Sequence, residues 1–273
     1  MGILPGAMTI DLHDLDIMPC QNSANADPDN SDTANLDTAS SDTESSDSTR
    51  PDFRNVFNKF TTLIRNSQIS RSRPVVVDDM SGGVWTAPLV ATMMMNAGHP
   101  DVFILDGGLP RWKKEYGLSD VAGSNARKLV FPPCVEALSS HHYGPDGFNQ
   151  QSGDIFVDYE DVLKRDSTAQ LVSLRHSWEF SQTGGDLPGS HNLPYSDLVS
   201  DDTLISEVLR PDYELRQAFD KAGIDPDKPI IAYCTMGIVT PVMKLALEEI
   251  DSPAINSLKL FQGGWQEYAA KLT

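Results

Sequence analysis

The sequence carries one structural unit twice. In the first copy the segments "RPVVVDD", "APLVATMMMNAG" and "FILDGGLPRW" follow one another, and in the second copy "KPIIAYC", "TPVMKLALEE" and "KLFQGGWQEY" follow in the same order. Each copy predicts a short buried strand, a loop, a helix with proline in its first turn, a second strand, and a Gly-Gly turn before an aromatic residue. A Leu-Pro-Gly turn precedes each copy, in "ILPGAMTIDLHDL" and in "DLPGSHNLPYSDL". Two repeated units therefore account for nearly all of the chain that is expected to fold.

Short strands that alternate with helices imply a parallel sheet with helices on both faces. Because 273 residues exceed the usual size of one hydrophobic core, we predict two α/β domains. We place the first domain at residues 1–118, a linker at residues 119–152, and the second domain at residues 153–273. Within the first domain, residues 21–50 hold almost no apolar side chains, and we interpret them as a disordered acidic insertion.

The formal net charge of -18 argues against nucleic acid or an anionic membrane as a partner, because both would repel such a surface. The three cysteines, Cys20, Cys134 and Cys234, are widely spaced and odd in number, which favours free thiols in a reducing compartment. No metal-ligand spacing occurs among them. We expect neither a metal nor an organic cofactor. Without a membrane span or a targeting signal, we expect a cytoplasmic protein, or a mitochondrial one if the native start is longer. The sequence gives no indication of the oligomeric state.

Cys234 lies where a parallel α/β sheet binds its ligands, beyond the carboxyl end of a strand. Alignment of the two copies places Asp79 opposite this cysteine, whereas a packing role would keep similar residues in both copies. A loop that leads into a helix can direct its N–H groups at an anion, so we expect Cys234 to be held as a nucleophilic thiolate. The residues expected to form this cradle are Thr235, Met236, Gly237, Ile238, Val239 and Thr240. The alternative is that Cys234 is a small buried hydrophobic residue at the end of its strand.

Several of these motifs together resemble the tandem rhodanese family, the thiosulfate and 3-mercaptopyruvate sulfurtransferases. They are the Leu-Pro-Gly turns, "DGGLPRW", "QGGW" and the single cysteine in a short loop before a helix, and the resemblance covers residues 1–19 and 51–273. It implies two rhodanese-like domains, of which only the second carries the nucleophile. The first domain would be shortened, because the family has a strand and a helix before the first Leu-Pro-Gly turn and this chain begins only a few residues ahead of it.

The resemblance also implies a reaction. Cys234 would take a sulfane sulfur from a small anionic donor, thiosulfate or 3-mercaptopyruvate, hold it as a persulfide among the loop amides, and pass it to cyanide or a thiol. Arg175 matches the arginine that follows the first strand of the family's catalytic domain and would bind the donor's anionic end. The alternative for Arg175 is an ion pair with Glu179 at the edge of the sheet. Tyrosine phosphatases use a similar loop but need an arginine at the position of Thr240, so phosphatase activity is not expected.

The chain departs from both branches of the family at the site. Thr235 and Met236 replace the basic residues of the thiosulfate branch and the Gly and Ser of the mercaptopyruvate branch, and Ile3 stands where a histidine is usual. Ser173 stands where an aspartate is usual. We therefore keep a second hypothesis, a rhodanese-like binding or regulatory protein with weak catalysis.

Overall fold

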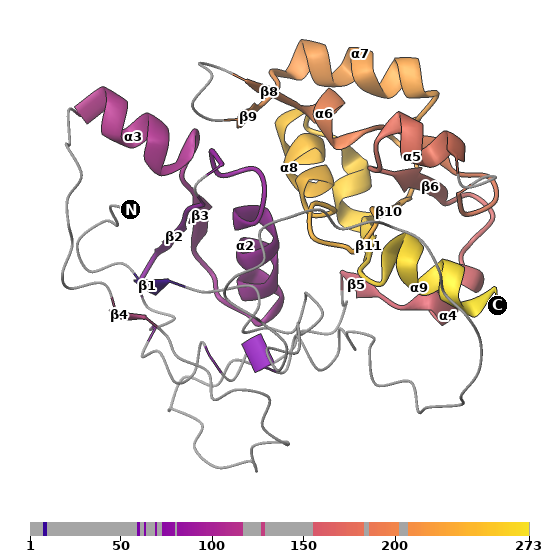
Figure 1. Ribbon diagram of the computed structural model, residues 1–273, viewed down its shortest axis with the longest axis horizontal. Helices are drawn as coiled ribbons and strands as arrows, with labels where there is room; N and C mark the ends of the chain where they lie inside the picture. The colour runs from indigo at the N-terminus through magenta and orange to yellow at the C-terminus, as the bar shows by residue number, and fades with distance from the viewer. Residues whose placement is uncertain are drawn as a thin grey trace, which may run out of the picture.

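A computed structural model of the chain describes residues 8–9, 59–60, 63, 69, 73–79, 81–116, 127–128, 155–182, 186–201 and 207–272. The predicted insertion at 21–50 and nearly all of the predicted linker lie outside these residues, as do Cys20 and Cys134. The described elements form two groups that lie side by side, one before residue 129 and one after residue 154 (Figure 1). Among the described helices, none combines the length and the apolar character that a membrane span requires.

The second domain is built on a five-stranded parallel sheet with the strand order β5-β11-β10-β6-β7. The strands are β5 (Phe156–Val157), β6 (Gln170–Ser173), β7 (His191–Asn192), β10 (Ile230–Tyr233) and β11 (Lys259–Phe261). Strand β10 is central and all of its residues are buried. Its carboxyl end therefore lies between the carboxyl ends of β6 and β11, and it delivers Cys234 to the middle of that edge.

The side chains of β10 alternate between two apolar layers. Ile230 and Ala232 belong to the core under α7 and α8, whereas Ile231 and Tyr233 belong to the layer formed with α4 and α9. A strand buried on both faces reads as a continuous apolar run, which is the pattern in "PIIAYC". The predicted parallel sheet with helices on both faces is thus confirmed for this domain (Figure 1). Its remaining elements are α4 (Tyr159–Leu163), α5 (Ser177–Gln182), α6 (Tyr195–Leu198), α7 (Asp212–Ala222), α8 (Val242–Glu249), η3 (Pro253–Ser257) and α9 (Gly264–Lys271).

In the described part of the first domain, a two-stranded parallel sheet pairs β2 with β3, and a second one pairs β1 with β4. Helix α2 packs its buried residues against Val77 of β2, while Val76 and Phe103 on the other face are 60% and 57% exposed. The elements are β1 (Met8–Thr9), β2 (Val75–Val77), α2 (Ala87–Asn96), β3 (Val102–Ile104), α3 (Gly108–Tyr116) and β4 (Arg127–Lys128).

The two copies of the repeat share one close backbone contact. The second glycine of each Gly-Gly pair has a positive φ, +60° at Gly108 and +56° at Gly264. A Cβ atom on Gly108 would lie 2.7 Å from the carbonyl oxygen of Asp79, and one on Gly264 would lie 2.3 Å from the carbonyl oxygen of Cys234. Only glycine allows the start of the last helix to approach the end of the central strand this closely. The Gly-Gly motif therefore fixes the position of residues 79 and 234 in their respective copies.

The first domain also supports the loop that follows Cys234. Ile238 and Met236 of this loop pack against the apolar cluster of α2. The hairpin of β8 (Val199–Asp201) and β9 (Glu207–Leu209) contacts the loop after β2, where the N–H of Glu207 donates to the carbonyl of Ser81 at 3.0 Å. Burial raises the pKa of Tyr195, whose hydroxyl lies 2.7 Å from Oε2 of Glu207. The loop at residues 235–240 thus belongs to the second domain and packs against the first.

Candidate active site

Cys234 is the residue that follows β10, and its side chain is almost enclosed. The residue is 6% exposed, and its Sγ accepts a hydrogen bond from the N–H of Gly237 at 3.0 Å. Both the position at the carboxyl end of the central strand and a main-chain donor at the sulfur agree with what the sequence suggested. The thiol also borders the apolar core of the domain, so burial and a polar contact coexist at this residue.

Within the loop at 235–240, Gly237 is the one described residue whose N–H reaches the sulfur. The N–H groups of Thr235, Met236, Ile238, Val239 and Thr240 make no hydrogen bond within the described part of the chain. Thr240 is fully buried just before the N-terminus of α8, and its Oγ1 also has no partner among the described residues.

The equivalent loop of the first copy already encloses an anion. The carboxylate of Asp79 accepts hydrogen bonds from five main-chain N–H groups at 2.8 to 3.1 Å. Oδ1 accepts from the N–H groups of Ser81 and Gly83, and Oδ2 accepts from those of Trp85, Thr86 and Ala87. Charge-assisted bonds of this kind are stronger than neutral ones. The repeat therefore provides an anion-binding loop, which holds a fixed carboxylate in one copy and a thiol in the other.

We expect Asp78, beside Asp79, to make the free energy of unfolding depend on pH. Burial raises the pKa of Asp78 from 3.8 to about 6, the hydrogen bond from the N–H of Leu109 opposes the rise, and the charge of Asp79 adds to it. The folded protein then binds this proton more tightly than the unfolded chain, so the contribution of Asp78 to stability falls as the pH rises from 4 to 6.

We therefore expect Asp78→Asn, which keeps an acceptor for Leu109, to gain stability relative to the unmodified protein as the pH rises. The difference in unfolding free energy between variant and parent is measured by urea unfolding at pH 4.5 and at pH 7. The variant should have its larger advantage at pH 7. An equal difference at the two pH values would show that Asp78 has no raised pKa.

Arg175 follows β6 and lies beside the Cys234 loop. Its guanidinium is stacked over the ring of Trp265, 4.9 Å from the centroid. The main-chain N–H of Trp265 donates to the carbonyl oxygen of Cys234 at 2.9 Å. Nη1 of Arg175 forms an ion pair with Oδ2 of Asp186 at 3.2 Å, and the two side chains are 4% and 0% exposed. The partner of this arginine is thus Asp186, whereas the alternative derived from the sequence named Glu179.

Asp186 and Gln262 are two residues of this region that the sequence did not indicate. Gln262 follows β11, is 3% exposed, and has neither amide atom hydrogen-bonded among the described residues. It contacts Gly237, because a Cβ atom on that glycine would lie 2.6 Å from Oε1 of Gln262. Asp186 belongs to the second Leu-Pro-Gly segment, which in the sequence served only as a sign of the repeat.

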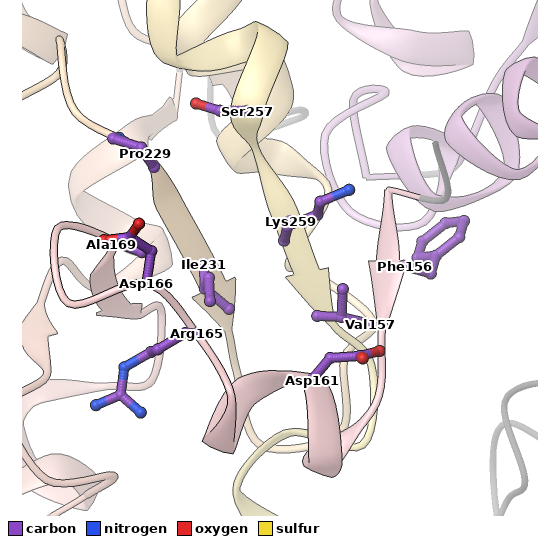
Figure 2. A pocket seen from close by; sticks show the side chains of 10 residues that line it. All are labelled: Phe156, Val157, Asp161, Arg165, Asp166, Ala169, Pro229, Ile231, Ser257 and Lys259. Carbon is purple, nitrogen blue, oxygen red and sulfur yellow. The ribbon is translucent and has the colours of Figure 1, made fainter. Parts of the chain in front are cut away.

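The hollow of about 400 Å³ shown in Figure 2 is separate from this site. Pro229, Ile231 and Lys259 place it at the amino ends of β10 and β11, the opposite end of the central strand from Cys234. Three of its charged side chains make local contacts: Arg165 donates to the carbonyl of Val162, Asp161 closes the N-terminal cap of α4, and Asp166 accepts from Thr168. No group of three or more His, Cys, Asp or Glu residues in the described ranges is arranged to hold a metal ion.

The family model of the rhodanese-like domain matches residues 158–271, which include the whole site. Over 223 residues the chain is 27% identical to 3-mercaptopyruvate sulfurtransferase of Escherichia coli K12, covering 78% of this chain and 70% of that enzyme. It is 28% identical to mitochondrial thiosulfate/3-mercaptopyruvate sulfurtransferase 1 of Arabidopsis thaliana, covering 74% of this chain but only 56% of that protein.

Solved structures give the same relationship. The crystal structure of SseA from Escherichia coli, described as a rhodanese fold, superposes with a TM-score of 0.56 at 27% identity and covers 76% of this chain and 72% of that one. Tum1 from Saccharomyces cerevisiae shares the fold, with a TM-score of 0.56 at 22% identity over 81% of this chain and 73% of that one. These similarities cover about three quarters of the chain, so they extend over both copies of the repeat. Residues 158–271 match the rhodanese-like domain, and over about three quarters of its length the chain is similar to 3-mercaptopyruvate and thiosulfate/3-mercaptopyruvate sulfurtransferases.

Proposed function

We propose that the protein is a sulfurtransferase, which moves a sulfane sulfur from thiosulfate or 3-mercaptopyruvate to cyanide or a thiol through a persulfide on Cys234. The observation that carries the proposal is the hydrogen bond from the N–H of Gly237 to Sγ, in a loop whose other N–H groups are unengaged. The five amides around Asp79 in the sister loop support it, because they indicate that this loop type favours a negative charge.

In the first half-reaction the Cys234 thiolate attacks the sulfur to be transferred, which is the outer sulfur of thiosulfate or the thiol sulfur of 3-mercaptopyruvate. A new S–S bond forms to Sγ, and the donor's bond to that sulfur breaks, releasing sulfite from thiosulfate or the enolate of pyruvate from 3-mercaptopyruvate. The enolate then takes up a proton. An S–S bond of about 2.05 Å carries the outer sulfur beyond Sγ, into the loop where the free N–H groups lie. There they stabilise the negative charge that the persulfide keeps.

In the second half-reaction cyanide or a thiolate attacks the outer sulfur. The S–S bond to Sγ breaks, the acceptor leaves as thiocyanate or a new persulfide, and the Cys234 thiolate is restored. Arg175 is our candidate for binding the donor's anionic end, because its Nε is buried and without a partner in the described structure. A cationic group at this place also attracts a donor anion toward a protein whose net charge is strongly negative.

One observation favours the second hypothesis, a binding or regulatory protein with weak catalysis. Met236 turns toward the apolar cluster of α2, so the second loop position offers a thioether where the mercaptopyruvate branch has a hydroxyl. A protein of this kind would bind anions at the loop without forming the covalent intermediate.

The mass of the intact protein separates the two hypotheses. After incubation with thiosulfate or 3-mercaptopyruvate, we expect the chain to gain the mass of one sulfur atom, on the peptide that contains Cys234. Cyanide should then remove the added sulfur and yield thiocyanate, and prior alkylation of the thiols should prevent the gain. A chain that binds the donor but stays at its original mass is a binding module.

A further inference from the structure

We propose that Asp186 is a positioning residue of the sulfur-transfer site, whose carboxylate holds the guanidinium of Arg175 beside the Cys234 loop. The inference rests on the proposed function and adds a residue to it. Oδ2 of Asp186 accepts hydrogen bonds from Nη1 of Arg175 at 3.2 Å and from Oγ of Ser173 at 2.9 Å. Ser173 and Arg175 lie two residues apart at the end of β6, so one carboxylate oxygen joins the two.

The carboxylate reaches this place from a separate element. Asp186 lies before β7, in a segment anchored by the buried Leu187 and by a turn in which the N–H of Ser190 donates to the carbonyl of Leu187. The strand residue that faces it, Ser173, contributes only a hydroxyl. The negative charge of the site therefore comes from the loop before β7 and not from β6.

Three contacts then fix Arg175. Asp186 holds one end of the guanidinium, and the ring of Trp265 lies against it at 4.9 Å. The amide Nδ2 of Asn192 donates to the carbonyl oxygen of Arg175 at 2.9 Å. The main-chain N–H of Trp265 donates a hydrogen bond to the carbonyl oxygen of Cys234. Direct contacts therefore connect Asp186, through Arg175 and Trp265, to the loop that begins at Cys234. The buried Nε has no partner in the described structure, so it is a donor that a ligand can use.

The charge of Asp186 and its positioning role predict opposite results. If the carboxylate merely reduced the positive charge of Arg175, its removal would strengthen the binding of an anionic donor. If it holds the guanidinium in place, removal leaves a buried cation without its partner, the guanidinium moves, and attack on the donor slows. The donor half-reaction should be affected, whereas the attack of cyanide on a persulfide that has already formed should not.

The test measures both half-reactions in single-turnover experiments with the full chain, thiosulfate as donor and cyanide as acceptor. We expect Asp186→Asn to form the persulfide about tenfold more slowly while cyanide removes it at the parent rate. The exposed Asp220→Asn on α7 is the matched control and should change neither rate. A loading rate that stays the same or rises, or an equal slowing of both half-reactions, would overturn the proposal.

An exchange variant covers the case in which Asp186→Asn does not fold. Ser173→Asp combined with Asp186→Ser has the parent composition and returns a carboxylate to the end of β6, within reach of Arg175. We expect it to fold and to load sulfur within about threefold of the parent, because the guanidinium regains its partner. An exchange variant that folds but does not recover loading, or that fails to fold, refutes the positioning role. A parent protein that takes up no sulfur would instead refute the proposed function, and this inference with it.

Discussion

Cys234→Ser should abolish sulfur transfer, with a loss of roughly 1,000-fold or more in the rate from either donor to cyanide. A serine hydroxyl is not ionised at neutral pH and forms no stable persulfide, so both half-reactions lose their covalent intermediate. The fold should survive, because serine is close to cysteine in size and its hydroxyl can accept the N–H of Gly237 that now donates to Sγ. Thiocyanate formation and the intact mass after donor treatment measure the effect, and thermal unfolding checks the fold.

The control for this variant is the double substitution Cys20→Ser and Cys134→Ser, which leaves Cys234 as the one thiol of the chain. Neither residue is assigned a role, so we expect at least about half of the parent rate and the same gain of one sulfur. Turnover that persists in Cys234→Ser and is lost in the double variant would move the nucleophile to another cysteine. It would also leave the amide cradle at 235–240 without a function.

The architecture of the second domain follows from the sequence because its signals are local. The run "PIIAYC" predicted a short buried strand, and in the structure Ile230 and Ile231 enter opposite apolar layers. The internal repeat then aligned Asp79 with Cys234, and the structure places both residues against the second glycine of a Gly-Gly pair. A repeat is informative because one backbone solution has to serve two sequences, so the shared residues are those that the backbone requires.

The partners within the site could not be predicted, because they depend on contacts between distant segments. The pairing of Arg175 with Asp186 requires the loop before β7 to fold back over the end of β6, and no local pattern encodes this. The sequence offered Glu179 because it is near Arg175 along the chain. Gln262 was missed for a similar reason, since its burial against Gly237 depends on the order of β10 and β11 in the sheet.

Gly237→Ala is the substitution expected to damage the cradle without touching the nucleophile. Gly237 has a φ of +80°, a region that costs an L-residue about 1–2 kcal/mol. A Cβ atom there would lie 2.2 Å from the carbonyl oxygen of Gln262, a backbone atom that cannot rotate away. The loop must therefore shift, and the N–H that now lies 3.0 Å from Sγ moves with it. We expect persulfide formation to slow by about 100-fold, since small displacements of catalytic groups have effects of this size.

Gly223, the C-cap residue of α7, separates the two causes of that loss, because it has a φ of +68° and the nearest atom to the position of its Cβ is Nδ1 of His191 at 3.6 Å, an ordinary contact. Gly223→Ala should lose about 1 kcal/mol of unfolding free energy from backbone strain and retain the parent rate of sulfur loading. Gly237→Ala should lose more stability than this, because the steric contact adds to the same strain. Urea unfolding and single-turnover loading of the two variants, measured side by side, provide the comparison. If both variants lose similar stability and both load sulfur normally, the N–H of Gly237 does not stabilise the sulfur, and the loop after β10 is only a connection between strand and helix.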